Sequence, residues 1–95
     1  MPYVHISRIP GLTFDGYRTV RDAMGADPIA GQLLHAVGEA DGALQIVDVW
    51  ESKAEADRFA GERLFPAFER TGMRPGSDAS YVAFDAAALD GVTAR

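Results

Sequence analysis

Hydrophobic and polar positions alternate along four short segments of the chain. Each segment is rich in β-branched or aromatic residues and is bounded by glycine, proline, alanine or aspartate, a pattern that predicts β-strands. We expect these strands at residues 3–9, 33–39, 44–50 and 80–84. Asp41-Gly42 separates the second strand from the third, and an Asp-Gly pair in this position is a strong signal for a β-hairpin.

Two further segments have apolar residues at helical spacing. The first helix is predicted to begin after Thr13, a candidate N-cap, and to end near Gly25; its apolar stripe comprises Phe14, Tyr17, Val20 and Met24. The second is expected to follow Ser52, which opens a Ser-x-x-Glu capping box, and to kink or end near Phe65 because of Pro66.

The order strand, helix, strand, strand, helix, strand predicts an α+β fold of the ferredoxin-like βαββαβ type. In that arrangement a four-stranded antiparallel sheet carries both helices on one face. Right-handed crossovers place the first and third strands in the centre and the others at the edges. We expect residues 1–95 to form a single domain, with residues 86–95 as a tail or as an arm onto a dimer partner.

Strand alternation divides the sheet into two faces of different chemistry. An apolar face collects Val4, Ile6, Leu34, Ala36, Val47, Val49, Val82 and Phe84, and is expected to pack on the helices. A mixed face collects Tyr3, His5, Ser7, Leu33, His35, Val37, Leu44, Ile46, Asp48, Trp50, Tyr81 and Ala83. Because the mixed face is too apolar for solvent and too polar for a sealed core, we expect a second copy of the chain to cover it, with a cavity between the two sheets.

The hairpin register brings two candidate catalytic residues together. A two-residue loop at Asp41-Gly42 places His35 opposite Asp48 and Leu33 opposite Trp50, and opposed Cβ atoms lie ~4.5–5.5 Å apart. A carboxylate beside an imidazole selects its tautomer and makes it a better general base. The alternative is a buried polar pair that determines only the strand register or the dimer geometry.

Other side chains of the mixed face are candidates for binding a substrate. Trp50 offers a flat wall for an aromatic ligand, or closes the end of the barrel as a core residue. Tyr17 is expected to pack with its ring and to direct its hydroxyl outward. The further binding candidates are Tyr81, His5, Ser7, Leu33 and Ile46. We predict no metal site, because His5 and His35 lie on strands separated by a third strand, with Cα atoms ~10 Å apart.

Composition and charge exclude several classes of function. The 95 residues include 9 basic and 14 acidic side chains, giving a net charge of -5, and no cysteine. The lack of cysteine excludes disulfides, thiolate nucleophiles, cysteine-ligated zinc and iron–sulfur clusters. The acidic balance argues against nucleic-acid binding. No segment has the pattern of a membrane span or a signal peptide, so we expect a cytoplasmic protein.

One local pattern resembles a known family. Trp50-Glu51-Ser52 is followed by Phe59, Leu64 and Pro66, and together with the element order and the hairpin it makes residues 4–84 resemble the dimeric α+β barrel superfamily. The most similar group is the antibiotic biosynthesis monooxygenase-like proteins, which include cofactor-independent oxygenases of aromatic polyketides, haem-degrading enzymes and isomerases. The resemblance implies a homodimer in which Trp50 lines the cavity.

The haem-degrading branch is not expected from this resemblance. Its members need an asparagine and a histidine in the helix after the tryptophan. Residues 55–62 contain no histidine, and the whole chain contains no asparagine.

These observations predict a homodimeric enzyme of aromatic natural-product metabolism, without a cofactor. We expect a cofactor-independent monooxygenase or a cyclase/isomerase in which His35, oriented by Asp48, removes a proton from a small aromatic or polycyclic ligand. Trp50 and Tyr81 would hold the ring system, and neither nucleic acid nor membrane is an expected partner. Because no complete catalytic motif is present, a non-catalytic ligand-binding or structural dimer is the alternative.

Overall fold

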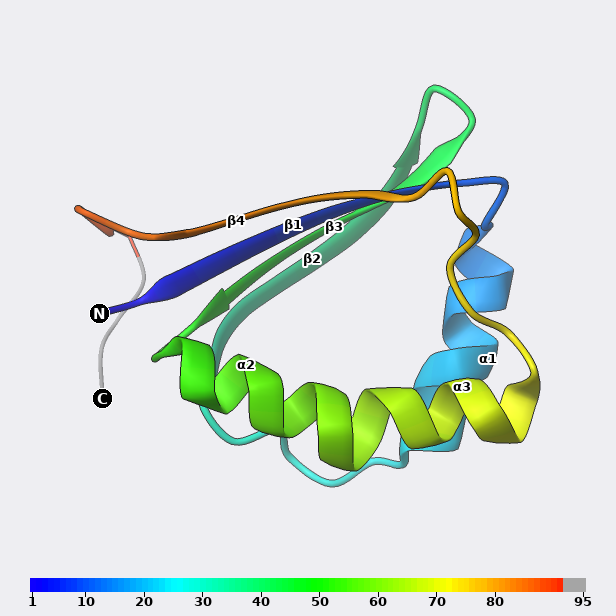
Figure 1. Cartoon of the computed structure of the whole chain (residues 1–95), viewed down its shortest axis with the longest axis horizontal. Coiled ribbons are helices and arrows are strands. Elements are labelled where there is room, and N and C mark those ends of the chain that lie inside the picture. The colour runs from blue at the N-terminus through cyan, green and yellow to red at the C-terminus, as the bar shows by residue number, and fades with distance from the viewer. Residues whose placement is uncertain (92–95) are drawn as a thin grey trace.

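The strands and helices expected from the pattern are all present in the computed structural model, which describes residues 1–91 (Figure 1). The strands are β1 (Tyr3–Pro10), β2 (Gln32–Ala40), β3 (Ala43–Trp50) and β4 (Ser80–Asp85). The helices are α1 (Phe14–Met24), α2 (Lys53–Phe59) and α3 (Phe65–Thr71), with a π-helical turn, η1 (Ala60–Leu64), between the last two. The antiparallel sheet has the order β2-β3-β1-β4, which confirms the ferredoxin-like fold with β1 and β3 at its centre.

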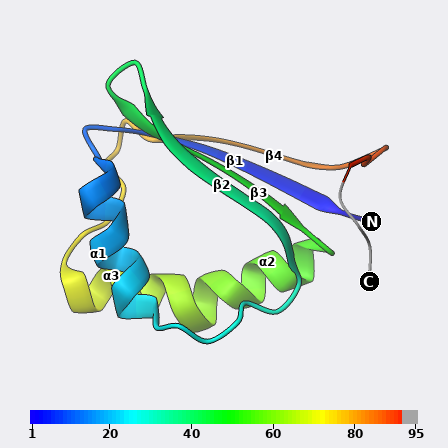
Figure 2. The same cartoon turned by 180° about the vertical axis from the view of Figure 1, so that it is seen from behind.

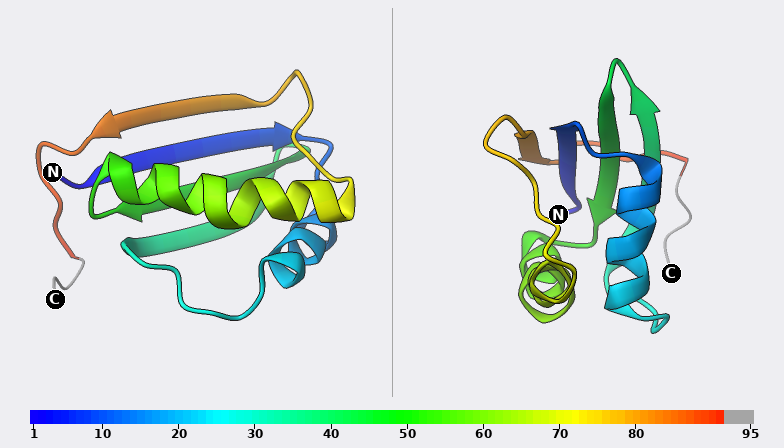
Figure 3. Two further views of the ribbon diagram at one scale, coloured as in Figure 1. Left: turned by 60° about the horizontal axis from the view of Figure 1, so that its bottom comes forward. Right: turned by 90° about the vertical axis from the view of Figure 1, so that its right-hand side faces the viewer.

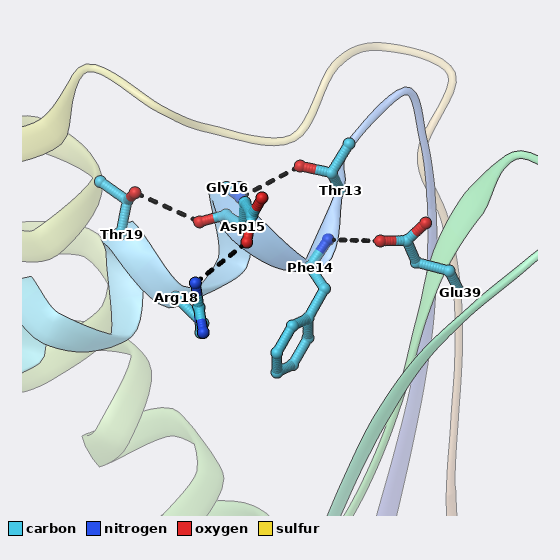
Figure 4. Close-up of polar contacts among 7 residues, drawn as sticks. All are labelled: Thr13, Phe14, Asp15, Gly16, Arg18, Thr19 and Glu39. Atoms are coloured by element: carbon cyan, nitrogen blue, oxygen red, sulfur yellow. Dashed lines mark hydrogen bonds and ion pairs between the residues drawn. The ribbon is translucent and has the colours of Figure 1, made fainter.

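Side-chain caps begin both helical segments where the sequence predicts them. Thr13 Oγ1 accepts a hydrogen bond of 3.1 Å from the amide of Gly16, and Ser52 Oγ accepts one of 3.4 Å from Glu55. Figure 4 shows a further acceptor that the sequence does not reveal: the amide of Phe14 donates to Glu39 Oε2 at 2.7 Å. A carboxylate at this position complements the helix dipole, so Glu39 joins the β2–β3 hairpin to the start of α1.

The second helical segment continues through Pro66 without ending. The amide of Phe65 donates to the carbonyl of Ala60, a bond that spans five residues instead of four. This wider turn lies directly before Pro66, which has no amide proton to donate. Consequently α2, η1 and α3 run along the sheet as one helical path (Figure 3, left). Within residues 1–91, every helix is too short or too polar to traverse a lipid bilayer.

The helices cover the mixed face, not the apolar face, so the expected assignment of the two faces is wrong. Tyr17 of α1 contacts His35, and the ring of Phe59 in α2 lies 5.1 Å from the ring of Trp50. Both helical segments lie on this one side of the sheet (Figure 3, right). Alternation separates the faces but does not say which one meets the helices. Here the helices supply polar and aromatic partners that satisfy the mixed face.

The apolar face is only partly covered. Val4 and Val49 form a small core with Ala86, onto which Leu89 also packs. The amide of Ala86 donates to the carbonyl of Pro2 at 2.8 Å, so the start of the tail packs on its own sheet. The exposed large side chains of this face are Leu34, Val82 and Phe84, at 39%, 57% and 47% exposure. Residues 92–95, the end of the expected tail or dimer arm, lie outside the described residues.

The β2–β3 hairpin extends beyond the neighbouring strands (Figure 2) and has the predicted turn. Asp41 and Gly42 have φ angles of 54° and 74°, as a type I′ turn requires. His35 pairs with Asp48 as expected. The pairing expected for Leu33 is wrong, because an irregularity between Gln32 and Leu34 places Gln32 opposite Trp50. A bulge of this kind inserts one extra residue into a strand, so that the residues before it point to the opposite face from the one expected.

Candidate active site

A cavity of about 1100 Å³ lies between the mixed face and the helices of the same chain. The expectation of a cavity between two sheets of a dimer is therefore wrong, for the same reason that the two faces are exchanged. Sheet and helices both contribute to its walls; the helical side includes Tyr17, Val20, Phe59, Leu64 and Phe68. Small-molecule sites typically occupy roughly 300–1,000 Å³, so this cavity is large enough for several fused rings.

The structure brings the predicted site residues together, with one exception. Those that line the cavity are His35, Asp48, Trp50, Tyr81, His5, Ser7 and Ile46. Leu33 instead packs against the core of Val4, Val49 and Ala86 on the apolar face. The bulge at the start of β2 accounts for this difference, because the expected register assumed an uninterrupted strand.

His35 and Asp48 form a close pair in the cavity wall. His35 Nδ1 lies 2.5 Å from Asp48 Oδ1, and the two side chains are 26% and 15% exposed. The same oxygen accepts a hydrogen bond of 3.2 Å from Gln32 Nε2. Because an ionised carboxylate only accepts hydrogen bonds, Nδ1 is the donor to Asp48, and in the neutral imidazole Nε2 then keeps its lone pair. Asp48 thus orients His35 as a base that acts through Nε2.

The hydroxyl of Tyr17 is hydrogen-bonded to that second nitrogen, Nε2. Its oxygen lies 2.5 Å from His35 Nε2, to which the hydroxyl donates when the imidazole is neutral, and the two rings stack with centroids 5.8 Å apart. Burial raises the pKa of the Tyr17 phenol above its ordinary value; the cation of Arg21 opposes the rise, and Asp48 adds to it. The phenol therefore stays protonated at neutral pH and is able to donate.

Sequence reasoning missed the roles of Tyr17 and Gln32. The outward direction expected for the Tyr17 hydroxyl is wrong, because only 7% of this residue is exposed and its hydroxyl meets His35. A tyrosine in a buried helical stripe needs a polar partner for its hydroxyl. This requirement would have pointed to His35 once the face of the sheet that meets the helices was known. Gln32 has no such signal, since a bulge determines its place.

A second polar group lies on β1 and β4. Ser7, which is buried, has its Oγ 3.3 Å from His5 Nδ1, and the ring of Tyr81 lies 5.7 Å from that of His5. His5 is also the register partner of Asp48, so the two histidines flank one aspartate across three strands. Among residues 1–91, no three potential ligands are arranged to hold a metal ion.

Arg63, in the π-helical turn, is hydrogen-bonded to the loop after α1, which contributes to the cavity wall. Its guanidinium donates to the carbonyl of Met24 at 3.0 Å and to that of Asp27 at 3.2 Å. Arg70 of α3 donates to the carbonyl of Ala23. These bonds tie the end of α1 to the second helical segment, and Met24 and Asp27 line the cavity. These two arginines thus help to hold part of the cavity wall in place.

Comparison with known proteins finds solved structures that share this fold. No protein-family profile matches the chain, and no curated protein matches it in sequence. Rv0793 from Mycobacterium tuberculosis has a TM-score of 0.73 and 15% identity, with 96% of this chain and 100% of that one covered. A protein from Chloroflexus aurantiacus named for antibiotic biosynthesis monooxygenases has a TM-score of 0.62 and 13% identity, with 96% and 100% covered.

A third relative is SnoaB, a cofactor-independent oxygenase from Streptomyces nogalater, with a TM-score of 0.64, 13% identity, and 94% and 96% covered. The haem-degrading protein MhuD of M. tuberculosis has the same fold. The chain therefore has the fold of the antibiotic biosynthesis monooxygenase-like α+β barrel proteins. At these identities the likeness concerns the fold, and the activity has to be argued from the site.

Proposed function

We propose that the chain is a small enzyme of aromatic natural-product metabolism, acting as a cofactor-independent oxygenase or as a cyclase/isomerase. The observation that carries this proposal is the Asp48–His35 pair in the wall of a cavity large enough for fused rings. A base oriented by a carboxylate suits the removal of a proton from a phenol or an activated C–H group. The fold shared with SnoaB is consistent with this chemistry.

The cavity walls support the same chemistry. Phe59 and Tyr81 offer aromatic surface to a ring system, and Trp50, which is only 2% exposed, packs against Phe59. The apolar surroundings favour an anion whose charge is delocalised over several rings. Removal of one proton to His35 leaves the electron pair on the substrate. In an oxygenase, dioxygen takes up these electrons; one oxygen atom enters the product as a carbonyl and the other leaves as water. In an isomerase, the proton returns to a different carbon.

The test uses dihydroxyanthrone, a three-ring phenol with an acidic methylene group. The chelator-treated protein is expected to increase oxygen uptake above the protein-free rate and to form dihydroxyanthraquinone, identified by mass spectrometry. His35→Gln is expected to lose this increase, while the exposed α1 variant Thr19→Ala keeps it. Product that forms by ring closure or proton return without oxygen uptake favours the cyclase/isomerase.

One result contradicts the enzyme assignment, and another contradicts the assignment of His35 as the base. The first is tight binding of dihydroxyanthraquinone with no turnover of any hydroxylated polycyclic probe, which supports the non-catalytic alternative. The other is full activity in His35→Gln, because a variant that lacks the proposed base should be inactive. A requirement for added metal or flavin would overturn the cofactor-independent part.

We further propose that the working form is a homodimer joined through the apolar face. Val82, Phe84 and Leu34 leave much of their surface exposed on this face, and contiguous apolar patches of this kind mark association surfaces. The row Ala36, Val47, Ile6 and Val82 crosses the middle of the sheet, where a second sheet would pack.

Val82→Asp is expected to convert the dimer to a monomer. The variant places a charge within the shared face, on the edge strand β4, and uncompensated interfacial charges of this kind should raise the dimer Kd at least ~100-fold. Sedimentation velocity at micromolar concentration measures the change, with Thr19→Asp as the charge-matched control. A monomeric unaltered protein, or a dimer that tolerates Val82→Asp, contradicts this interface.

A further inference from the structure

The basic nitrogen of His35 is not free to face a ligand. Nδ1 is committed to Asp48, and the lone pair of Nε2 accepts the hydroxyl proton of Tyr17, each across 2.5 Å. A base that acts on substrate directly needs an unoccupied lone pair within hydrogen-bond reach. Here the next group after Asp48 and His35 in the series of contacts is the phenol oxygen of Tyr17, a residue that also lines the cavity.

The position of Tyr17 suits a group that stays in place during a reaction. Its ring stacks with two others, that of Phe14 with centroids 5.6 Å apart and that of His35 at 5.8 Å. It packs in the core with Ile9 and Leu44, and it also lines the cavity. A substrate in the cavity therefore meets an oxygen that is oriented by packing and already hydrogen-bonded to its proton acceptor.

We propose that Tyr17 is a catalytic residue whose phenol oxygen takes the proton from the substrate while its own proton passes to His35 Nε2. This inference rests on the proposed function and adds the group that touches the substrate. The substrate C–H or O–H bond breaks and its electron pair stays on the substrate. A new O–H bond forms at Tyr17, the former hydroxyl proton makes His35 an imidazolium, and Asp48 balances that charge. His35 then acts through Tyr17, as a positioning residue.

The experiment follows proton removal separately from oxygen chemistry. Dihydroxyanthrone is incubated without oxygen in deuterated buffer, and exchange of its methylene protons is followed by NMR. The unaltered protein is expected to accelerate exchange. Tyr17→Phe, which removes only the hydroxyl, should lower the accelerated rate by roughly 10²–10⁴-fold. Thr19→Ala, on the outer side of the same helix, should keep it.

A second measurement verifies the state of Tyr17 without a substrate. The charged and titratable groups around its phenol are His35 on β2, Asp48 on β3 and Arg21 on α1. The folded chain keeps this phenol protonated to a higher pH than the unfolded chain, whose tyrosines titrate near pH ~10. Stability from this source is therefore complete below about pH 10 and is lost as the pH rises through the raised pKa of Tyr17. Tyr17→Phe should flatten this alkaline decline in urea unfolding.

The outcomes separate this inference from the proposed function. Exchange that survives in Tyr17→Phe but disappears in His35→Gln overturns the inference, since His35 then acts directly. Absence of exchange with the unaltered protein overturns it as well. Exchange that requires Tyr17, without oxygen uptake in air, supports the inference and overturns only the oxygenase assignment. Circular dichroism shows whether Tyr17→Phe is folded, and a variant that is folded and loses exchange supports a chemical role.

Discussion

Asp48→Asn is expected to lower kcat with dihydroxyanthrone by a factor of roughly 10⁴, the size of effect seen when a carboxylate that orients a catalytic histidine becomes an amide. Asp48 Oδ1 accepts both from His35 and from Gln32. An asparagine in this place is able to turn its amide group toward Nδ1 and donate to it, which selects the tautomer with the proton on Nε2. The lone pair that accepts the Tyr17 proton is then lost, although the side chain keeps its shape.

The measurement pairs steady-state kinetics with binding. The Kd for dihydroxyanthraquinone should change by less than about threefold, because asparagine keeps the size and shape that Asp48 has in the cavity wall and alters only the orientation of the base. Asp15→Asn is the matched control, since Asp15 forms an exposed pair with Arg18 on α1. Unchanged kcat in Asp48→Asn would mean that the pair with His35 serves the strand register only.

Leu44→Ala should have the largest effect on stability, a loss of about 2–5 kcal/mol in the free energy of unfolding. Leu44 is completely buried and packs with Ile9 and Tyr17 between the sheet and α1. Removal of its side chain leaves a cavity in a small domain that has few other fully buried side chains. Urea unfolding at one fixed protein concentration measures the change, because the proposed dimer would also contribute to the apparent stability.

Leu44→Met is the control for this prediction. It nearly conserves the volume of the side chain and should cost less than about 1.5 kcal/mol. If Leu44→Ala costs no more than Leu44→Met, the contact between the sheet and α1 contributes less to stability than its burial indicates.

Local sequence signals were sufficient for the fold and for the central pair of the site. The Asp41-Gly42 turn has few backbone conformations open to it, so the pairing of His35 with Asp48 follows from counting residues. Thr13 and Ser52 mark helix starts through hydrogen bonds to residues only three positions away. Each of these signals lies within one hairpin or one helical turn.

The errors arise where distant parts of the chain decide the outcome. Alternation is identical for either assignment of the two faces, and the choice depends on what α1 and α2 bring to the sheet. Leu33 was misplaced because a bulge has no fixed residue signature. The contact between Tyr17 and His35 presents the first of these difficulties, since it joins a helix to a strand across the wrongly assigned face.

The location of the cavity changes what association means for this protein. Tyr17, His35, Asp48 and Trp50 all come from one chain and surround a space on the opposite side of the sheet from Val82 and Phe84. Two chains that pack through their apolar faces would therefore carry two separate and complete sites, one on each outer side of the dimer. Pairing then protects the sheet from solvent without building the chemistry, so the sequences of the two surfaces are free to change independently of one another.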